Sequence, residues 1–347
     1  MSQLGEVIST ARRAKGWTQE TLAERAGVTQ ATLSRYESGL RTPDDEALAH
    51  VARALGVTPA LLREAGRIEG GIAVNAHMRR QKTTPVTVWR ELEAQLNLVR
   101  LHAAHLGEEV ALRAERSVPS FDTDETSPAD AARLLRAQWR MPVGPIGNLT
   151  DWMESAGVLV VESNFGAGPR VDGLSQWANE HPIVMINANM PTDRLRFTLA
   201  HELGHLVLHS IYIDDQAEQQ ANEFAAELLL PAEQISHYLR RLRIGDLIEL
   251  KRTWGVSIAA LVERAHGLNL ITGQQRASMY KMLNARGLRN PEPASEDIAP
   301  EHPRLGAHIG ESLAARGLTP PEIAEIAGFA TPADNFLFSG RGLRVVS

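Results

Sequence analysis

The chain has 347 residues, enough for two or three domains, and its formal net charge of -6 excludes a uniformly basic nucleic-acid-binding protein. It contains no cysteine, which excludes a disulfide scaffold, a thiolate metal site and a thiol nucleophile. Hydrophobic residues make up 43%, yet no stretch approaches the roughly 18 apolar residues of a transmembrane helix. We therefore expect a cytoplasmic protein with no membrane partner.

The first 66 residues predict five short helices joined by tight turns. Apolar residues recur at helical spacing, while hydroxyl residues such as Thr18 and Thr29 stand where helices begin. Gly27 and Gly39 stand where helices end, and Thr42-Pro43 is expected to open the fourth helix. The pattern is typical of a small all-helical domain.

Residues 67–126 predict a linker followed by one long helix. The segment 67–84 contains a Gly-Gly pair and a basic run, Arg79-Arg80-Gln81-Lys82, which could touch DNA phosphates but is more simply a solvated connector. Helical periodicity over 86–116 predicts a long helix. Such a helix would either brace two domains or form a homodimer.

From residue 127 the pattern predicts a mixed helix and strand region. Ser127-Pro128 starts a helix, and three strand-like runs follow at 157–163, 173–178 and 182–187. We expect the last run, PIVMIN, to offer an edge at which an extended peptide could pair. Two helices are predicted over about 192–210 and 215–230, then further helices and a possible small hairpin near the C-terminus.

The run AHELGHLVLH, residues 200–209, carries two histidines four apart, with Glu202 directly after the first. Residues i and i+4 of a helix share one face, about 5–6 Å apart, so His201 and His205 can bind one metal ion. Glu202 lies about 100° further round the helix, where it can approach a water at the metal without ligating the ion. This H-E-x-x-H spacing is typical of zinc peptidases.

A catalytic zinc needs a third protein ligand. His209 lies about 12 Å along the helix from His201, too far to reach the same ion, so we expect it to pack or to support a ligand. Glutamates of the next predicted helix are better candidates, namely Glu218, Glu223 and Glu227. Glu218 is favoured because it shares a helix face with Asn222, which could orient a histidine from behind.

The run DRLRFTLAHELGHLVLH, followed by AEQQANEFAAELLLP, resembles the ImmA/IrrE family of metallopeptidases, gluzincin-like in layout. The resemblance covers roughly residues 130–293 and implies a zinc-dependent endopeptidase that cleaves helix-turn-helix repressors. It implies His201, His205 and Glu218 as ligands and Glu202 as catalytic base. Manganese or iron could occupy the same ligands. Gln220 departs from the family, in which a second glutamate is common at this position.

The stretch WTQETLAERAGVTQATLSRYESGLRTP resembles the Xre/Cro-type helix-turn-helix family and implies binding of double-stranded DNA through residues 1–66. Glutamine can read adenine, and arginine can reach guanine or phosphate. The recognition helix is expected over about 29–38, and the candidate DNA contacts are Gln19, Gln30, Ala31, Thr32, Ser34 and Arg35. The eight basic and eight acidic side chains of residues 1–66 balance, so a protein-docking module is the alternative.

The expected fold class is α+β, mainly α, with an N-terminal five-helix helix-turn-helix domain, a zincin-like metallopeptidase domain with a small β-sheet and active-site helix, and a helical C-terminal region. The expected boundaries are 1–66 for the DNA-binding domain, 67–126 for the linker and long helix, 127–231 for the metallopeptidase core, 232–293 for the helices that complete it, and 294–347 for a C-terminal tail or small helical extension.

These features predict a zinc-dependent endopeptidase fused to a DNA-binding domain, a transcriptional or stress-response regulator that cleaves a repressor protein. The alternative is a non-enzymatic DNA-binding regulator or antitoxin whose metallopeptidase-like domain binds a partner or senses metal, because a ligand set cannot prove turnover. A third hypothesis is self-cleavage within 67–84. The donor that would stabilise the reaction's oxyanion is left open among Tyr280, His181 and Tyr212.

Overall fold

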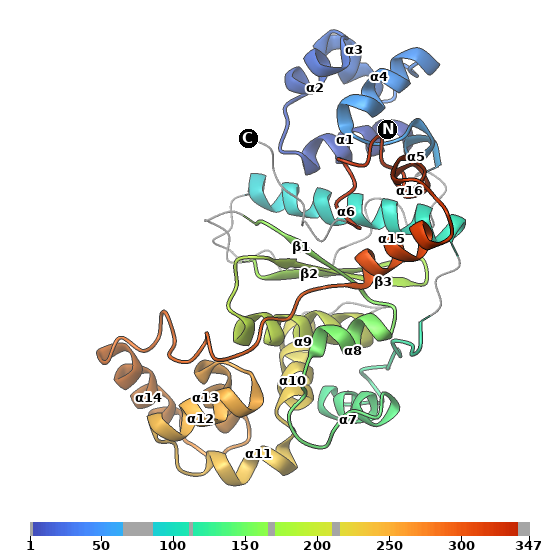
Figure 1. Cartoon of the computed structure of the whole chain (residues 1–347). Coiled ribbons are helices and arrows are strands. Elements are labelled where there is room, and N and C mark those ends of the chain that lie inside the picture. Colours follow the sequence, from blue (N-terminus) through green and yellow to red (C-terminus); the bar gives the residue numbers. More distant parts are fainter. Residues whose placement is uncertain (1–2, 65–85, 111–113, 166–170, 210–215, 339–347) are drawn as a thin grey trace. The chain divides into compact units, whose positions relative to one another are not determined.

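The computed structural model describes residues 3–64, 86–110, 114–165, 171–209 and 216–338 (Figure 1). The predicted linker with its basic run, and Tyr212, lie outside these ranges. The chain divides into two compact units. Unit 1 comprises Met1–Glu115, Gly157–Ala188 and Pro303–Ser347, and unit 2 comprises Arg116–Ala156 and Asn189–His302.

Unit 1 begins with the five helices that the sequence predicts, α1 (Gln3–Ala14), α2 (Gln19–Ala26), α3 (Gln30–Glu37), α4 (Asp45–Leu55) and α5 (Pro59–Glu64). Thr18 and Thr29 cap α2 and α3 by accepting from backbone N–H groups three residues on, at 3.1 and 3.2 Å. The expected start of the fourth helix at Thr42-Pro43 is wrong, because the Asp44 carboxylate accepts from Ala47 N at 2.9 Å and caps α4 instead.

Helix α6 (Val86–Glu109) packs against α1 and α5 and also against two of the strands of unit 1 (Figure 1). Almost every side chain from Leu92 to Leu106 is buried, and one hydrophobic cluster joins the N-terminal helices, α6, the sheet and residues near the C-terminus. The helix is a brace between two layers of unit 1, and it ends before the predicted residue 116.

The three predicted strands form one mixed sheet of β1 (Leu159–Ser163), β2 (Gly173–Ala178) and β3 (His181–Asn187), in the order β1-β3-β2. Strand β3 runs parallel to β1 and antiparallel to β2. The expectation that PIVMIN offers a free edge is therefore wrong, because β3 is hydrogen-bonded on both sides. Its continuous run of buried residues from 182 to 186 is what a central strand requires.

The last described segment of unit 1 forms the predicted helical hairpin, α15 (Leu305–Ala315) and α16 (Pro320–Ile326). Beyond α16 the chain pairs with the loop between α4 and α5. Thr58 N donates to Gly328 O at 2.9 Å, Ala330 N donates to Gly56 O at 3.1 Å, and Phe329 is buried. This segment is therefore a helical extension that packs into the core of unit 1.

Unit 2 is helical in its described part. It contains α7 (Pro128–Gln138), α8 (Leu149–Ser155), α9 (Thr192–Leu208), α10 (Ala217–Leu229), α11 (Ala232–Leu239), α12 (Ile244–Trp254), α13 (Ile258–Gly267) and α14 (Gly273–Ala285). Ser127 caps α7 with Pro128 in the first turn, as the sequence predicts. Helix α10 packs against both α9 and α7, so α9, which carries the H-E-x-x-H run, lies within the helical core of this unit.

Two buried ion pairs anchor the first turns of α9 within unit 2. Asp193 pairs with the fully buried Lys251, and Arg196 pairs with Glu301. Glu301 also accepts from the backbone N and the hydroxyl of Thr150, at 2.9 and 3.0 Å. Removal of one partner of such a pair leaves a buried charge and costs about 3–5 kcal/mol, so these contacts hold α9 firmly in place.

No helix among the described residues combines the length and the apolar character needed to cross a lipid bilayer.

Candidate metal centre and nucleic-acid interface

Helices α9 and α10 approach each other closely at Gly204. A Cβ atom added to Gly204 would lie 3.1 Å from Phe224 Cδ1 and 3.2 Å from Ala221 Cα. Because Gly204 and Ala221 are small, the two backbones come close enough for side chains of the first turn of α10 to reach the face of α9. The glycine of H-E-L-G-H thus determines the spacing of the two helices.

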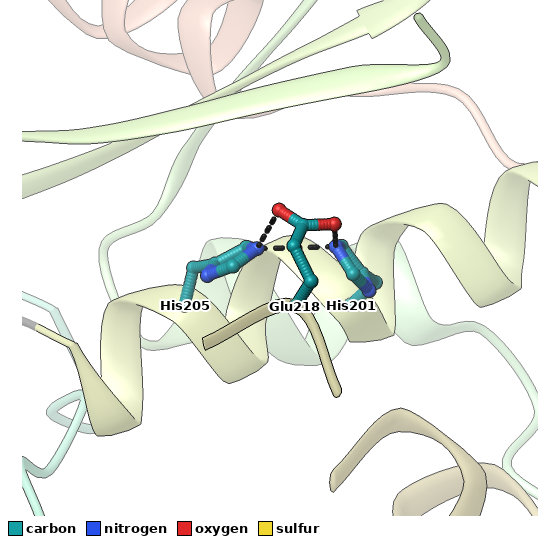
Figure 2. Close-up of side chains that lie close together, drawn as sticks. All are labelled: His201, His205 and Glu218. Carbon is teal, nitrogen blue, oxygen red and sulfur yellow. Dashed lines mark hydrogen bonds and ion pairs between the residues drawn. The ribbon is translucent and has the colours of Figure 1, made fainter. Parts of the chain in front are cut away.

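Three side chains converge at this crossing, His201 and His205 from α9 and Glu218 from α10 (Figure 2). The two Nε2 atoms lie 3.1 Å apart. The Glu218 carboxylate oxygens lie 3.8 Å from His201 Nε2 and 3.5 Å from His205 Nε2. Tetrahedral zinc with bonds of about 2.0–2.1 Å places its ligand atoms about 3.3 Å from one another. The separations and the donor types therefore fit a single zinc ion.

The ring of His201 is held uncharged. Burial and the neighbouring His205 lower the pKa of His201 to about 4, although the Glu218 carboxylate acts in the opposite direction. At neutral pH the ring keeps a nitrogen lone pair, which is the form that binds a metal ion.

The Nδ1 atom of each histidine, on the side of the ring away from the cluster, contacts another polar side chain. His201 Nδ1 donates to Asn222 Oδ1 at 3.1 Å, and Asn222 Nδ2 donates to Glu218 O at 2.8 Å. His205 Nδ1 lies 3.1 Å from His209 Nδ1, and His209 Nε2 donates to Gln220 Oε1 at 2.7 Å. Asn222 thus contacts His201 from α10, and its role in orienting that ring stays a prediction. The contact of His209 with Gln220 was not predicted.

The two other glutamates considered as ligands lie elsewhere. Glu223 is exposed, and the buried Glu227 pairs with Arg264 and, at 3.2 Å, with Arg133. Glu202 follows His201 on α9 with a buried side chain, 5% exposed.

Of the oxyanion candidates, Tyr280 donates its hydroxyl to Glu263 at 2.6 Å, and His181 belongs to unit 1. Tyr212 lies outside the described residues. The Tyr280 hydroxyl is thus held by a glutamate of α13.

The predicted recognition helix is α3, with an exposed polar face and a buried apolar face. Leu33 and Tyr36 are buried, as expected from the spacing. The proposed DNA contacts lie on the other side, where Gln30, Ala31 and Arg35 are exposed and Thr32 and Ser34 are half-buried.

A chain of polar contacts links α1, α2 and α3. Arg12 binds the Glu37 carboxylate at 2.6 and 2.9 Å, and Gln19 Nε2 donates to the same carboxylate at 2.8 Å. Gln30 Nε2 in turn donates to Gln19 Oε1 at 2.9 Å. This network fixes the start of α2 against α3, and the phosphate contact of Gln19 stays a prediction.

Two family models match this chain, one over the helices that carry the metal cluster and one over the N-terminal helices. Residues 153–266 match the family model of the IrrE N-terminal-like domain, and residues 8–62 match that of the helix-turn-helix. The first range includes the three converging side chains, and the second covers most of α1–α5.

Three curated relatives are similar to parts of the chain. The radiation response metalloprotease IrrE of Deinococcus deserti is 38% identical, over 24% of this chain and 37% of the relative. The protein of the same name from Deinococcus radiodurans is 28% identical, over 45% of this chain and 50% of the relative. Multiprotein-bridging factor 1 of Schizosaccharomyces pombe is 35% identical, over 16% of this chain and 36% of the relative. The chain thus spans half or less of the length of each.

Proposed function

We propose that this chain, which carries an IrrE-like metalloprotease domain and a helix-turn-helix DNA-binding domain, is a zinc-dependent endopeptidase that controls transcription by cleaving a repressor protein. The observation that carries the proposal is the convergence of His201, His205 and Glu218 at separations suited to one tetrahedral ion. Two histidines and one glutamate are the ligand set of known zinc peptidases.

The chemistry assigned to this site is hydrolysis of a peptide bond. When bound, a divalent metal supplies a Lewis acid that polarises the scissile carbonyl and acidifies the attacking water. Glu202 accepts the proton of that water and passes it to the leaving amine. Asn222 holds the ring of His201 with its Nε2 directed at Glu218 and His205, which keeps the ligand set in position for the reaction.

The DNA-binding domain gives the peptidase access to a particular class of substrate. A chain that binds near an operator raises the effective concentration of its peptidase domain around other proteins bound there. The substrate class is therefore a DNA-bound repressor, and the resemblance to the ImmA/IrrE family implies one of the helix-turn-helix type. The relatives named radiation response metalloproteases support a role in stress response, and they match this chain over half or less of their length.

Substitution of Glu202 by Gln tests the enzymatic part of the proposal, because it removes the base and leaves all three proposed ligands. We expect Glu202→Gln to lower the rate of cleavage of repressor proteins by about 10²–10⁴-fold, with unchanged zinc content. Glu223→Gln removes an exposed glutamate of α10 and is the matched control, which should cleave like wild type.

The cleavage is measured on purified protein with repressors encoded near its gene, followed by mass spectrometry of the products. Cleavage by Glu202→Gln at the wild-type rate, or cleavage that survives a chelator, would show that the proposed mechanism is wrong. Normal regulation in cells that carry only Glu202→Gln would instead support a non-enzymatic regulator.

A further inference from the structure

We propose that His209 and Gln220 form a hydrogen-bonded relay that sets the tautomer and the orientation of the His205 ring. The inference rests on the proposed metal site and adds two positioning residues to it. Neither residue has a place in the H-E-x-x-H pattern, and they come from different segments, His209 at the C-terminal end of α9 and Gln220 in the second turn of α10.

The relay is an unbroken series of contacts from His205, in the cluster, to Gln220 in α10. His205 and His209 are 1% and 2% exposed, so neither ring has access to solvent water in place of a protein partner. Their Nδ1 atoms lie 3.1 Å apart, and His209 Nε2 lies 2.7 Å from Gln220 Oε1. The backbone also fixes the pair, because His209 N donates to His205 O at 3.0 Å.

The groups at the two ends of the relay determine where the ring protons lie. His205 Nε2 faces His201 and Glu218, so it needs its lone pair for the metal, and the ring proton is then on Nδ1. That proton is donated to His209 Nδ1, which must be an acceptor, so His209 carries its own proton on Nε2. The Gln220 amide oxygen, which can only accept, receives it.

The relay also has a consequence for charge at the site. Both ligating rings are supported by amide oxygens, His201 directly by Asn222 and His205 through His209 by Gln220. A carboxylate in either place would add a negative charge near the ion, whereas an amide adds none. Glu218 thus remains the one anionic residue of the cluster that the structure describes, which preserves the Lewis acidity of a divalent ion.

The experiment measures zinc affinity and ring tautomers, neither of which requires turnover. We expect His209→Leu to weaken zinc binding about 10–100-fold, and Gln220→Leu to weaken it by a smaller factor in the same direction. His209→Asn keeps an acceptor near the position of Nδ1, and Gln220→Glu keeps the acceptor for Nε2. Both should retain affinity closer to wild type than the leucine variants.

Zinc affinity is measured by competition with a chromophoric chelator, and the fold of each metal-free variant is checked by circular dichroism. In wild-type protein, long-range ¹⁵N–¹H NMR of the imidazole rings should place the proton of His205 on Nδ1 and that of His209 on Nε2. This measurement decides the matter even if a leucine variant fails to fold.

Wild-type zinc affinity of a folded His209→Leu, or a proton on Nδ1 of His209, would overturn the relay. The relay and the proposed function can fail separately. A protein that binds zinc with these effects but cleaves no substrate would contradict the peptidase alone. A wild type that binds no zinc would contradict the metal site, and the tautomer of His209 in the metal-free protein would still decide the relay.

Discussion

At the scale of single residues, His102 shows how the fold controls the charge of a side chain. It is fully buried on α6, its ring stacks on Phe329 with centroids 3.9 Å apart, and its Nδ1 donates to Ala327 O at 2.7 Å. Burial lowers the pKa of His102 to about 3, while the hydrogen bond to Ala327 acts in the opposite direction. The ring is therefore neutral throughout the physiological range of pH.

A buried neutral histidine makes the protein sensitive to acid. The pKa of His102 in the folded state lies below the value of about 6.5 expected in the unfolded chain. The contribution of the neutral ring to the free energy of unfolding is therefore fully present above pH 6.5 and is lost as the pH falls towards 3. At pH 5 the loss is about 2 kcal/mol. Between pH 7.5 and pH 5, the free energy of unfolding of His102→Phe, which keeps the stacking, should fall by about 2 kcal/mol less than that of wild type.

The difference is measured as the shift of the urea midpoint between the two pH values. His201, whose pKa is also lowered, acts in the same direction and remains in the variant. His50→Gln removes an exposed histidine and should keep the wild-type pH dependence. If His102→Phe also kept it, the assignment of a neutral His102 would be wrong.

The candidate site could be predicted from the sequence only as far as local geometry reaches. A spacing of four residues places His201 and His205 together on any helix, so that pair follows from the sequence alone. Glu218 required the further argument that it shares a helix face with Asn222. The contact between His209 and Gln220 joins two helices, and it depends on how closely they cross, which no local pattern states.

At the scale of secondary structure, the crossing of α9 and α10 determines whether the proposed metal ligands meet. Gly204 faces backbone atoms of α10, because a Cβ atom at this position would lie 3.2 Å from Ala221 Cα and 3.3 Å from Ala221 O. Backbone cannot turn aside as a flexible side chain can, so a methyl group at this position must move the helices apart.

Gly204→Ala should therefore weaken zinc binding. Overpacking costs about 1–3 kcal/mol, and a loss of about 1.4 kcal/mol at the metal site corresponds to a tenfold lower affinity. Gly245→Ala is the matched control, because Gly245 lies in α12 with no atom within 4 Å of its added Cβ. Zinc titration of both variants checks the expectation, and equal affinities for the two would contradict this account of the crossing.

The elements themselves were largely predictable, and their arrangement was not. Hydroxyl caps and terminal glycines mark many helix ends in the sequence, and the three strands lie close to their predicted ranges. Strand order depends on pairing between β1 and β3, which are separated by β2 in the chain. The central position of β3 therefore became evident only from the structure, and with it the loss of the expected substrate edge.

At the scale of the whole molecule, the DNA-binding helices share the core of unit 1 with other parts of the chain. The helix-turn-helix match ends at residue 62, yet the buried cluster continues through α6 to the sheet and to Phe329. Phe329 stacks on His102 and forms a β-bridge with Val57 in the loop before α5. The C-terminal extension is thus part of the support of the DNA-binding helices.

Phe329→Ala tests this shared core. Truncation of a buried phenylalanine costs about 3–5 kcal/mol, and we expect faster hydrogen exchange in α4 and α5 as well as in α6. Leu134→Ala, which shortens an exposed leucine of unit 2, is the control and should leave exchange in these helices unchanged. Unchanged protection of α4 and α5 in Phe329→Ala would show that the N-terminal helices are stable on their own.

The central claim is that side chains of α9 and α10 hold one divalent ion, and the metal content of purified protein tests it most directly. Native mass spectrometry of the wild type should show about one zinc per chain, and His205→Ala, with its helical content intact by circular dichroism, should show almost none. Equal zinc in the two proteins, or a wild type that takes up no divalent metal, would contradict the claim.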